Sequence, residues 1–182
     1  MNRGIIWDAI GWKTEWTIHK LRDPDGRYAQ MLQAGASMEE ALAAGAVLLC
    51  VERFEGNVAL NEGLQYLIDI ITGIQGSPTL WDNTNARIGV GNSSAAEDPT
   101  HTGLQGASKA YHAMDATYPQ RSGQIGEWRS TFPDGEAEFA WEEFTVVNAS
   151  DDTGKNLNRK IASKGTKASG ESWTCSVKIT FS

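Results

Sequence analysis

The sequence predicts an α+β, β-rich fold in which an N-terminal extension of mixed helix and strand precedes an antiparallel, jelly-roll-like β-sandwich. Short runs of alternating apolar and polar residues recur through the second half of the chain, and polar turns rich in Gly and Asp separate them. One strongly periodic helix comes before these runs. We therefore expect residues 1–56 to form the extension and residues 57–182 to form a helix followed by the sandwich.

The extension is expected to hold two strands, a turn and a short helix. Residues 12–21 alternate between apolar and polar side chains, which is typical of a strand. "RDPDG" at residues 22–26 predicts a turn, and "SMEE" at residues 37–40 is a capping box that begins a helix ending at Gly45. The run "AVLLCVERFE" at residues 46–55 is short, partly β-branched and bounded by glycines, so we expect a buried strand.

The clearest helix is predicted for "ALNEGLQYLIDIITG", residues 59–73. Its large apolar side chains recur with a period of 3.6 residues and so share one face. They are Leu60, Leu64, Leu67, Ile68 and Ile71. Gly73 is suited to end this helix.

Alternation then returns in a series of predicted strands. They lie at residues 86–90, 126–132, 137–148, 157–163 and 172–181. Trp128, Trp141 and Trp173 occupy the apolar phase of their strands, so we expect them in the core. Glu142 and Glu143 interrupt the phase of their strand, as a β-bulge would. In the run 157–163, Arg159 shares its phase with Leu157 and Ile161.

Charge composition limits the partners that we expect. The 182 residues carry 16 Lys and Arg against 23 Asp and Glu, a formal net charge of −7. An acidic chain can neutralise few nucleic-acid phosphates with Lys and Arg, so direct nucleic-acid binding is not expected. The cations gather after Gly154, and such asymmetry suits the packing of identical copies against one another.

Cysteine content and hydropathy predict where the chain folds. Cys50 and Cys175 are the only cysteines and form no CxxC pair, so we expect free, buried thiols and folding inside the cell. No apolar run approaches the ~18–20 residues that cross a membrane. The apolar run within residues 1–11 is too short for a signal peptide.

The stretch "ARIGVGNSSAAEDPTHTGLQG", residues 86–106, begins like a phosphate-binding loop. A dinucleotide site needs a third Gly and a following helix, and a Walker A loop needs Gly-Lys-Ser/Thr. Neither follows Gly91, so we expect no nucleotide cofactor. We interpret the stretch as a core strand whose glycines allow close packing, followed by an exposed loop that contacts a neighbouring subunit.

We predict no catalytic, cofactor-binding or metal-binding residues. The three histidines, His19, His101 and His112, lack partners at ligand spacing. Asp98 and His101 lie near Ser93, Ser94 and Ser108, but no Gly-x-Ser-x-Gly elbow presents a nucleophile. Neighbouring carboxylates such as Glu142 and Glu143 point to opposite faces of a strand, unlike a glycosidase pair. A weak surface Ca²⁺ site at Asp151 and Asp152 is the alternative left open.

Several sequence elements occur in an order that resembles a known family. They are "LNEGLQYLIDIITG", "NTNARIGVGNSSAAEDPTHTGLQGAS", "YHAMDATYPQ", "WRSTFPDGEAEFAWEEFTVVN", "LNRKIASKGTK" and "ESWTCSVKITF". Together they resemble small virion structural proteins of tailed bacteriophages, over residues 57–182. The resemblance implies a non-enzymatic, β-rich assembly protein present in many copies and assembled in the host bacterial cytoplasm. The resemblance implies no catalytic or binding residues for this sequence.

These observations predict a capsid decoration (cement) protein. It would form a homo-oligomer, with a trimer favoured, and bind across neighbouring major capsid subunits, without contacting nucleic acid or membrane. Its Trp-rich start would reach onto a neighbouring subunit. One alternative is a tail-associated protein of the tip, collar or fibre attachment. The other is a carbohydrate-binding domain that uses exposed aromatic side chains on the host surface.

Overall fold

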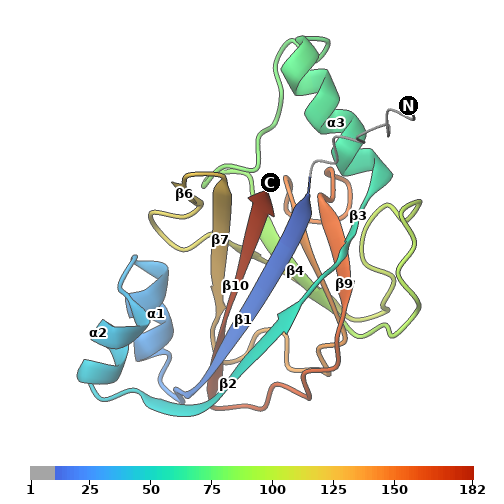
Figure 1. Cartoon of the computed structure of the whole chain (residues 1–182). Coiled ribbons are helices and arrows are strands. Elements are labelled where there is room, and N and C mark those ends of the chain that lie inside the picture. The colour runs from blue at the N-terminus through green and yellow to red at the C-terminus, as the bar shows by residue number, and fades with distance from the viewer. Residues whose placement is uncertain (1–10) are drawn as a thin grey trace, which may run out of the picture.

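A computed structural model describes residues 11–182 of the chain (Figure 1). Trp7 and the segment considered for a signal peptide lie outside these residues. Strands make up 38% and helices 15%, and the strands form two antiparallel sheets. The prediction of a β-rich α+β fold is therefore confirmed.

The first sheet has five strands in the order β2-β1-β10-β7-β6. Their bounds are β1 Trp12–Arg22, β2 Val47–Glu55, β6 Gln120–Ser122, β7 Ile125–Phe132 and β10 Glu171–Phe181. β1 pairs with β10 along its whole length, from Trp12 opposite Phe181 to Arg22 opposite Glu171. The two strands of residues 11–56, β1 and β2, thus belong to the same sheet as β6, β7 and β10.

The second sheet has the order β3-β9-β8-β4-β5. Its strands are β3 Val58–Ala59, β4 Arg87–Gly91, β5 Lys109–Ala113, β8 Glu143–Val147 and β9 Asn158–Ile161. The predicted strand 137–148 is only half correct, because β8 begins at Glu143. Before it the chain turns tightly: Ala137 has a φ of 54°, and its carbonyl accepts hydrogen bonds from Phe139 N and Trp141 Nε1.

One hydrophobic core is built from both sheets. Trp141 is wholly buried and packs edge-on against Phe132 and Trp173, with ring centroids 4.9 and 4.8 Å away. Phe144 of β8 meets Trp16 of β1 across the core, 5.6 Å between centroids. The predicted core positions of Trp141 and Trp173 are confirmed; Trp128 is partly buried against the same core. Trp16 is therefore enclosed in its own chain and cannot reach a neighbour.

Two short helices, α1 (Arg27–Gln33) and α2 (Met38–Ala43), cover one end of the first sheet on its outer face, the face turned away from the second sheet. Leu21, Leu32 and Ala41 form a small second core there. The predicted capping box is present, with Ser37 Oγ accepting from Glu40 N and Glu40 Oε2 accepting from Ser37 N. The α1 helix was not predicted.

The α3 helix (Asn61–Thr72) confirms the helix predicted for residues 59–73 and ends at Gly73, whose φ is 71°. A glycine is required at position 63 as well. A Cβ there would lie 2.6 Å from the Asn156 carbonyl and 2.7 Å from the Leu157 Cα. The first turn of α3 therefore lies directly on the chain that enters β9, and the rest of the helix extends beyond the ends of the sheets (Figure 1).

Residues 46–55 were predicted to form a buried strand; the strand is present, but the prediction that it is buried is wrong. They do form β2, but β2 is an edge strand, and Val47, Leu48 and Leu49 are 54, 38 and 45% exposed. An apolar run of this length fits either position, because periodicity does not reveal which strands lie at an edge. Cys50 is exposed for the same reason, contrary to prediction, whereas Cys175 is buried as predicted.

We expect a thiol reagent to modify one cysteine of the folded chain quickly and the other only after unfolding. Cys50 is accessible, whereas burial of Cys175 blocks the reagent and raises the pKa of its thiol, and only a thiolate reacts. Thiol release with and without denaturant measures this difference. Cys50→Ser should abolish the fast reaction and Cys175→Ser should leave it; two fast thiols would contradict the structure.

Candidate functional site

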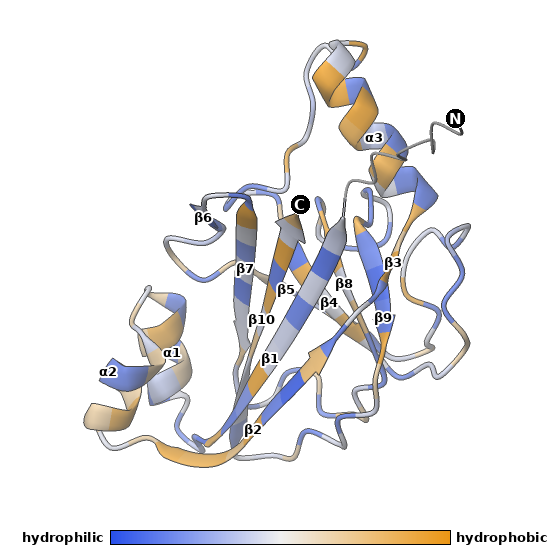
Figure 2. Ribbon diagram, in the orientation of Figure 1, coloured by the Kyte–Doolittle hydropathy of each residue, from blue (hydrophilic) through white to orange (hydrophobic). Residues whose placement is uncertain are grey.

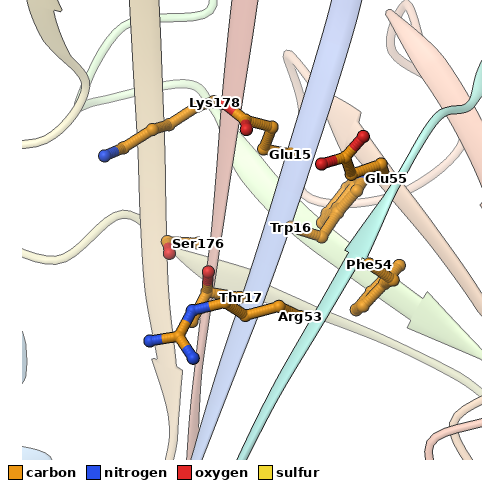
Figure 3. A pocket seen from close by; sticks show the side chains of 8 residues that line it. All are labelled: Glu15, Trp16, Thr17, Arg53, Phe54, Glu55, Ser176 and Lys178. Atoms are coloured by element: carbon orange, nitrogen blue, oxygen red, sulfur yellow. The ribbon is translucent and has the colours of Figure 1, made fainter.

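A charged cleft of about 280 Å³ lies on the outer face of the first sheet (Figure 3). Glu15 and Glu55 stand opposite each other on β1 and β2. Lys13 Nζ lies 3.0 Å from a Glu15 oxygen and 3.8 Å from a Glu55 oxygen. The two carboxylate side chains are 46 and 67% exposed. Such solvated ion pairs stabilise little, and neither of these exposed carboxylates is desolvated as the acid of a glycosidase is.

The three histidines lie apart and form no shared site. His19 projects from β1, and its burial lowers the pKa of the imidazole, which favours the neutral ring. His112 Nδ1 lies 2.7 Å from Glu136, and His101 Nδ1 lies 3.2 Å from Arg159. Within residues 11–182, no group of three or more His, Cys, Asp or Glu side chains is placed to hold a metal ion.

The structure does not assemble a hydrolytic triad from the serines near His101. Asp98 Oδ1 accepts hydrogen bonds from the Thr100 amide at 2.8 Å and the Thr100 hydroxyl at 2.6 Å, which lower the pKa of Asp98. Ser93 Oγ accepts from the Ala95 amide. These contacts are local turns of a loop.

The neighbouring carboxylates also have separate roles. Asp152 pairs with Lys109 Nζ at 2.8 Å, so a cation already faces the carboxylate considered for Ca²⁺. Asp151 caps its own turn through Thr153. Glu142 accepts from the Ser163 hydroxyl, and Glu143 is wholly buried. None of these four carboxylates faces another carboxylate across a cleft.

The buried Glu143 belongs to an ion pair on the outer face of the second sheet. Arg159 Nε donates to Glu143 Oε2 at 2.8 Å, Arg159 Nη2 lies 2.8 Å from the same oxygen, and both side chains are fully buried. Glu143 also accepts from the Gln105 and Gly106 amides. A Cβ on Gly91 would collide with this carboxylate, so the glycine provides the space for it.

The loop that follows Gly91 covers this ion pair. Arg159 donates to the carbonyls of Ala95 at 3.1 Å and Ala96 at 3.2 Å. Most of the loop is exposed, as predicted. Its backbone carbonyls nevertheless accept the remaining hydrogen bonds of the buried Arg159 guanidinium. The sequence pattern did not predict this role, although it holds two signals: Arg159 lies on the apolar phase of its strand, and Glu143 interrupts the apolar phase of another.

A second buried ion pair connects α1 to the first sheet. Arg129 Nε donates to Asp115 Oδ2 at 2.7 Å, and Arg129 Nη2 donates to the carbonyls of Leu32 and Ala36 at 2.9 Å each. Thr131 donates to Asp115 through its amide and hydroxyl. The group therefore fixes the α1–α2 pair in place and leaves no unpaired charge to act on a ligand.

Unpartnered apolar surface is concentrated on α3. One stripe of the helix is exposed to solvent, and we call it the α3 row. It consists of Leu64, Ile68, Ile71 and, just beyond the helix, Ile74, which are 40, 56, 78 and 74% exposed. The side of the helix that faces the rest of the protein carries the buried Leu60 and the partly buried Tyr66, Leu67 and Ile70. The apolar arc of α3 is thus wider than its own chain covers. Figure 2 shows apolar residues along most of the helix.

An apolar groove of about 480 Å³ lies at the β6–β7 end of the first sheet. Its walls include Pro119, Ile125, Trp128, Phe181 and Arg121, and we call it the Trp128 groove. Trp128 Nε1 donates to the Trp81 carbonyl at 2.9 Å, which fixes the indole in the wall. β6, which contributes Gln120 and Arg121 to the groove, and α3 lie toward the same end of the sheets (Figure 1).

Comparison with known proteins does not assign the chain to a family. No family model, curated protein or solved structure matches it. None of the helices within residues 11–182 has the length and apolar character needed to cross a bilayer.

Proposed function

We propose that the chain is a non-enzymatic structural protein of a tailed-phage virion. Within that class we propose a capsid decoration protein that forms a homo-oligomer and binds across neighbouring major capsid subunits. One observation carries the proposal: two unpartnered apolar surfaces lie at opposite ends of one β-sheet body. They are the α3 row and the start of β2, both orange in Figure 2. A body with apolar surface at both ends is suited to joining neighbours.

The start of β2 is suited to contact a capsid subunit. Val47, Leu48 and Leu49 lie on the free edge of the first sheet and are exposed. Edge strands are normally protected by charged residues, Pro or a bulge that twists the edge away. Residues 41–51 contain no charge, and although β2 shifts register near its start, the strand stays exposed there. Such an edge favours the addition of a strand from another chain.

The strand pairing supports the jelly-roll-like arrangement, which we propose for the sandwich. β1 pairs with β10, β3 with β9 and β4 with β8, so pairs formed early and late in the chain are nested. Nested antiparallel pairing is what a rolled long hairpin produces. β2 and the β6–β7 hairpin then extend the first sheet on its two sides.

The carbohydrate-binding alternative has less support. Sugar binding of this kind needs aromatic rings on the surface, whereas Trp16, Trp81, Trp141 and Trp173 are 8% exposed or less. A glycan array with the purified chain tests it directly.

Binding to purified expanded shells that lack the protein tests the proposal. We expect the wild-type chain to sediment with the shells and to raise their resistance to heat or denaturant. Leu49→Lys, which places a charge on the β2 edge, should weaken binding, whereas Ser150→Lys on an exposed loop should not. Binding to tails alone would favour the tail-associated alternative, and binding to neither would refute a virion role at these surfaces.

A further inference from the structure

His101 lies against the guanidinium of the buried Arg159, under the loop that follows Gly91. Its ring nitrogen Nδ1 is 3.2 Å from Arg159 Nη1. An arginine side chain only donates hydrogen bonds and keeps its proton at every pH at which proteins work, so Nδ1 must be the acceptor. A ring nitrogen that accepts carries no proton. The contact therefore requires the neutral ring of His101, with its proton on Nε2.

A proton on Nδ1 would break this contact and add a second cation beside Arg159. The guanidinium is balanced by one carboxylate, Glu143, and both side chains are fully buried. A further positive charge at this place would have no buried counterion, and the protein interior screens it poorly. Asp98, whose backbone carbonyl accepts from the His101 amide at 3.1 Å, is exposed, so water and salt weaken the attraction of its carboxylate for the ring.

The other charged groups on the elements around the ring already have partners. On the loop, Glu97 accepts from the Ile161 amide at 2.6 Å and lies 3.7 Å from Lys160 Nζ of β9. In the first turn of α3, Glu62 accepts from an amide of the chain that enters β9, at 2.9 Å. Within residues 11–182, no carboxylate forms an ion pair with the His101 ring to offset a proton on it.

Residues 95–101, which we call the covering segment, are attached to a single guanidinium by three hydrogen bonds. Arg159 donates to the carbonyls of Ala95 and Ala96 as well as to His101. Most of the covering segment is exposed, so little buried surface holds it down. Such segments open locally at a lower free energy than the strands beneath them. Repulsion between His101 and Arg159 therefore acts on the group that holds the covering segment in place.

We propose that His101 is a pH-sensitive switch that keeps the covering segment closed over the Arg159–Glu143 ion pair when neutral and releases it when protonated. The switch operates within one chain and does not depend on the proposed virion role. The released state binds one more proton than the closed state. The closed state is therefore favoured above the pH range in which histidine titrates and becomes less favoured as the pH falls through that range. One proton changes the ratio of closed to released chains by at most about tenfold per pH unit.

Hydrogen exchange of two backbone amides between pH 8 and 5.5 tests the switch. Ile161 N donates to Glu97 Oε1 and Asn61 N donates to the Pro99 carbonyl, so both amides lose their acceptor when the covering segment opens. After correction for the intrinsic exchange rate, we expect their protection factors to fall as the pH falls, by up to about tenfold per pH unit. Amides in the β1–β10 pairing should keep theirs. Ordinary carboxyl groups titrate near pH 4, below this range.

Two substitutions of His101 separate its charge from its hydrogen bond. His101→Asn provides an amide oxygen that accepts from Arg159 and does not titrate, so protection should stay high at every pH. His101→Lys places a permanent cation there and should give low protection over the whole range. His19→Asn removes a histidine of the first sheet and is the matched control, which should keep the wild-type pH dependence. Circular dichroism verifies the fold of each variant.

Three results would overturn the switch. Constant protection of Ile161 and Asn61 in the wild-type chain between pH 8 and 5.5 would show that the closed segment accommodates the protonated ring. A pH dependence that persists in His101→Asn would assign the proton to another group. Protection in His101→Lys equal to that of wild type at pH 8 would show that a cation beside Arg159 does not open the covering segment.

Discussion

Arg159→Met is expected to destabilise the fold by about 3–5 kcal/mol, because removing one member of a buried ion pair leaves the other charge uncompensated. Glu143 would remain fully buried with no cation beside it. The carbonyls of Ala95 and Ala96 would also lose their donor. Chemical denaturation followed by tryptophan fluorescence measures the loss.

Two further variants separate the ion pair from simple loss of a long side chain. Arg159→Met with Glu143→Gln should recover part of the stability, since the double variant removes the unpaired charge. Lys160→Met changes the neighbouring residue, whose ammonium lies 3.7 Å from Glu97, and should cost less than about 1 kcal/mol. An Arg159→Met variant as stable as Lys160→Met would show that the pair does not stabilise the fold.

Trp141→Ala is expected to cost about 3–5 kcal/mol, the usual penalty for emptying a large aromatic site in a core. The indole is fully buried between the rings of Phe132, Trp173 and Phe144. Its Nε1 also donates to the Ala137 carbonyl, which would lose this partner. Thermal and chemical unfolding should both show the change.

Leu80→Ala is the matched control for this core substitution. Leu80 is 44% exposed, so truncating it removes little buried surface and should change stability by less than about 1 kcal/mol. Trp141→Phe should fall between the two, because it keeps most of the aromatic packing and loses only the hydrogen bond and part of the volume. Equal losses for Trp141→Ala and Leu80→Ala would contradict the packing described.

The strands with strict alternation were predictable, and the polar or short elements were not. β1, β4 and β10 are long or clearly alternating, so their inward faces could be assigned from sequence. β6 is three polar residues, and β3 is two residues. Their strand conformation depends on the neighbours to which they hydrogen bond, which local sequence does not specify.

The candidate site was harder to predict because it depends on which surfaces remain uncovered. The 3.6-residue period predicted the helix, but three residues of its predicted apolar face, Leu64, Ile68 and Ile71, are exposed. Tyr66 and Ile70, outside that predicted face, pack against the core instead. Likewise, Glu143 and Arg159 are brought together only by strand pairing in the second sheet. Local sequence patterns indicate which residues are suited to burial. The tertiary arrangement decides which of them are covered by other parts of the same chain.

The pairing of β1 with β10 has a consequence for synthesis on the ribosome. β1 lies between β2 and β10 in the middle of the first sheet, yet its second neighbour is translated about 150 residues after it. Until β10 leaves the exit tunnel, Trp16 and Ile18 lack half of the sheet that buries them. The first sheet must therefore close after translation of β10, and the nascent chain carries an apolar strand that chaperones can bind in the meantime.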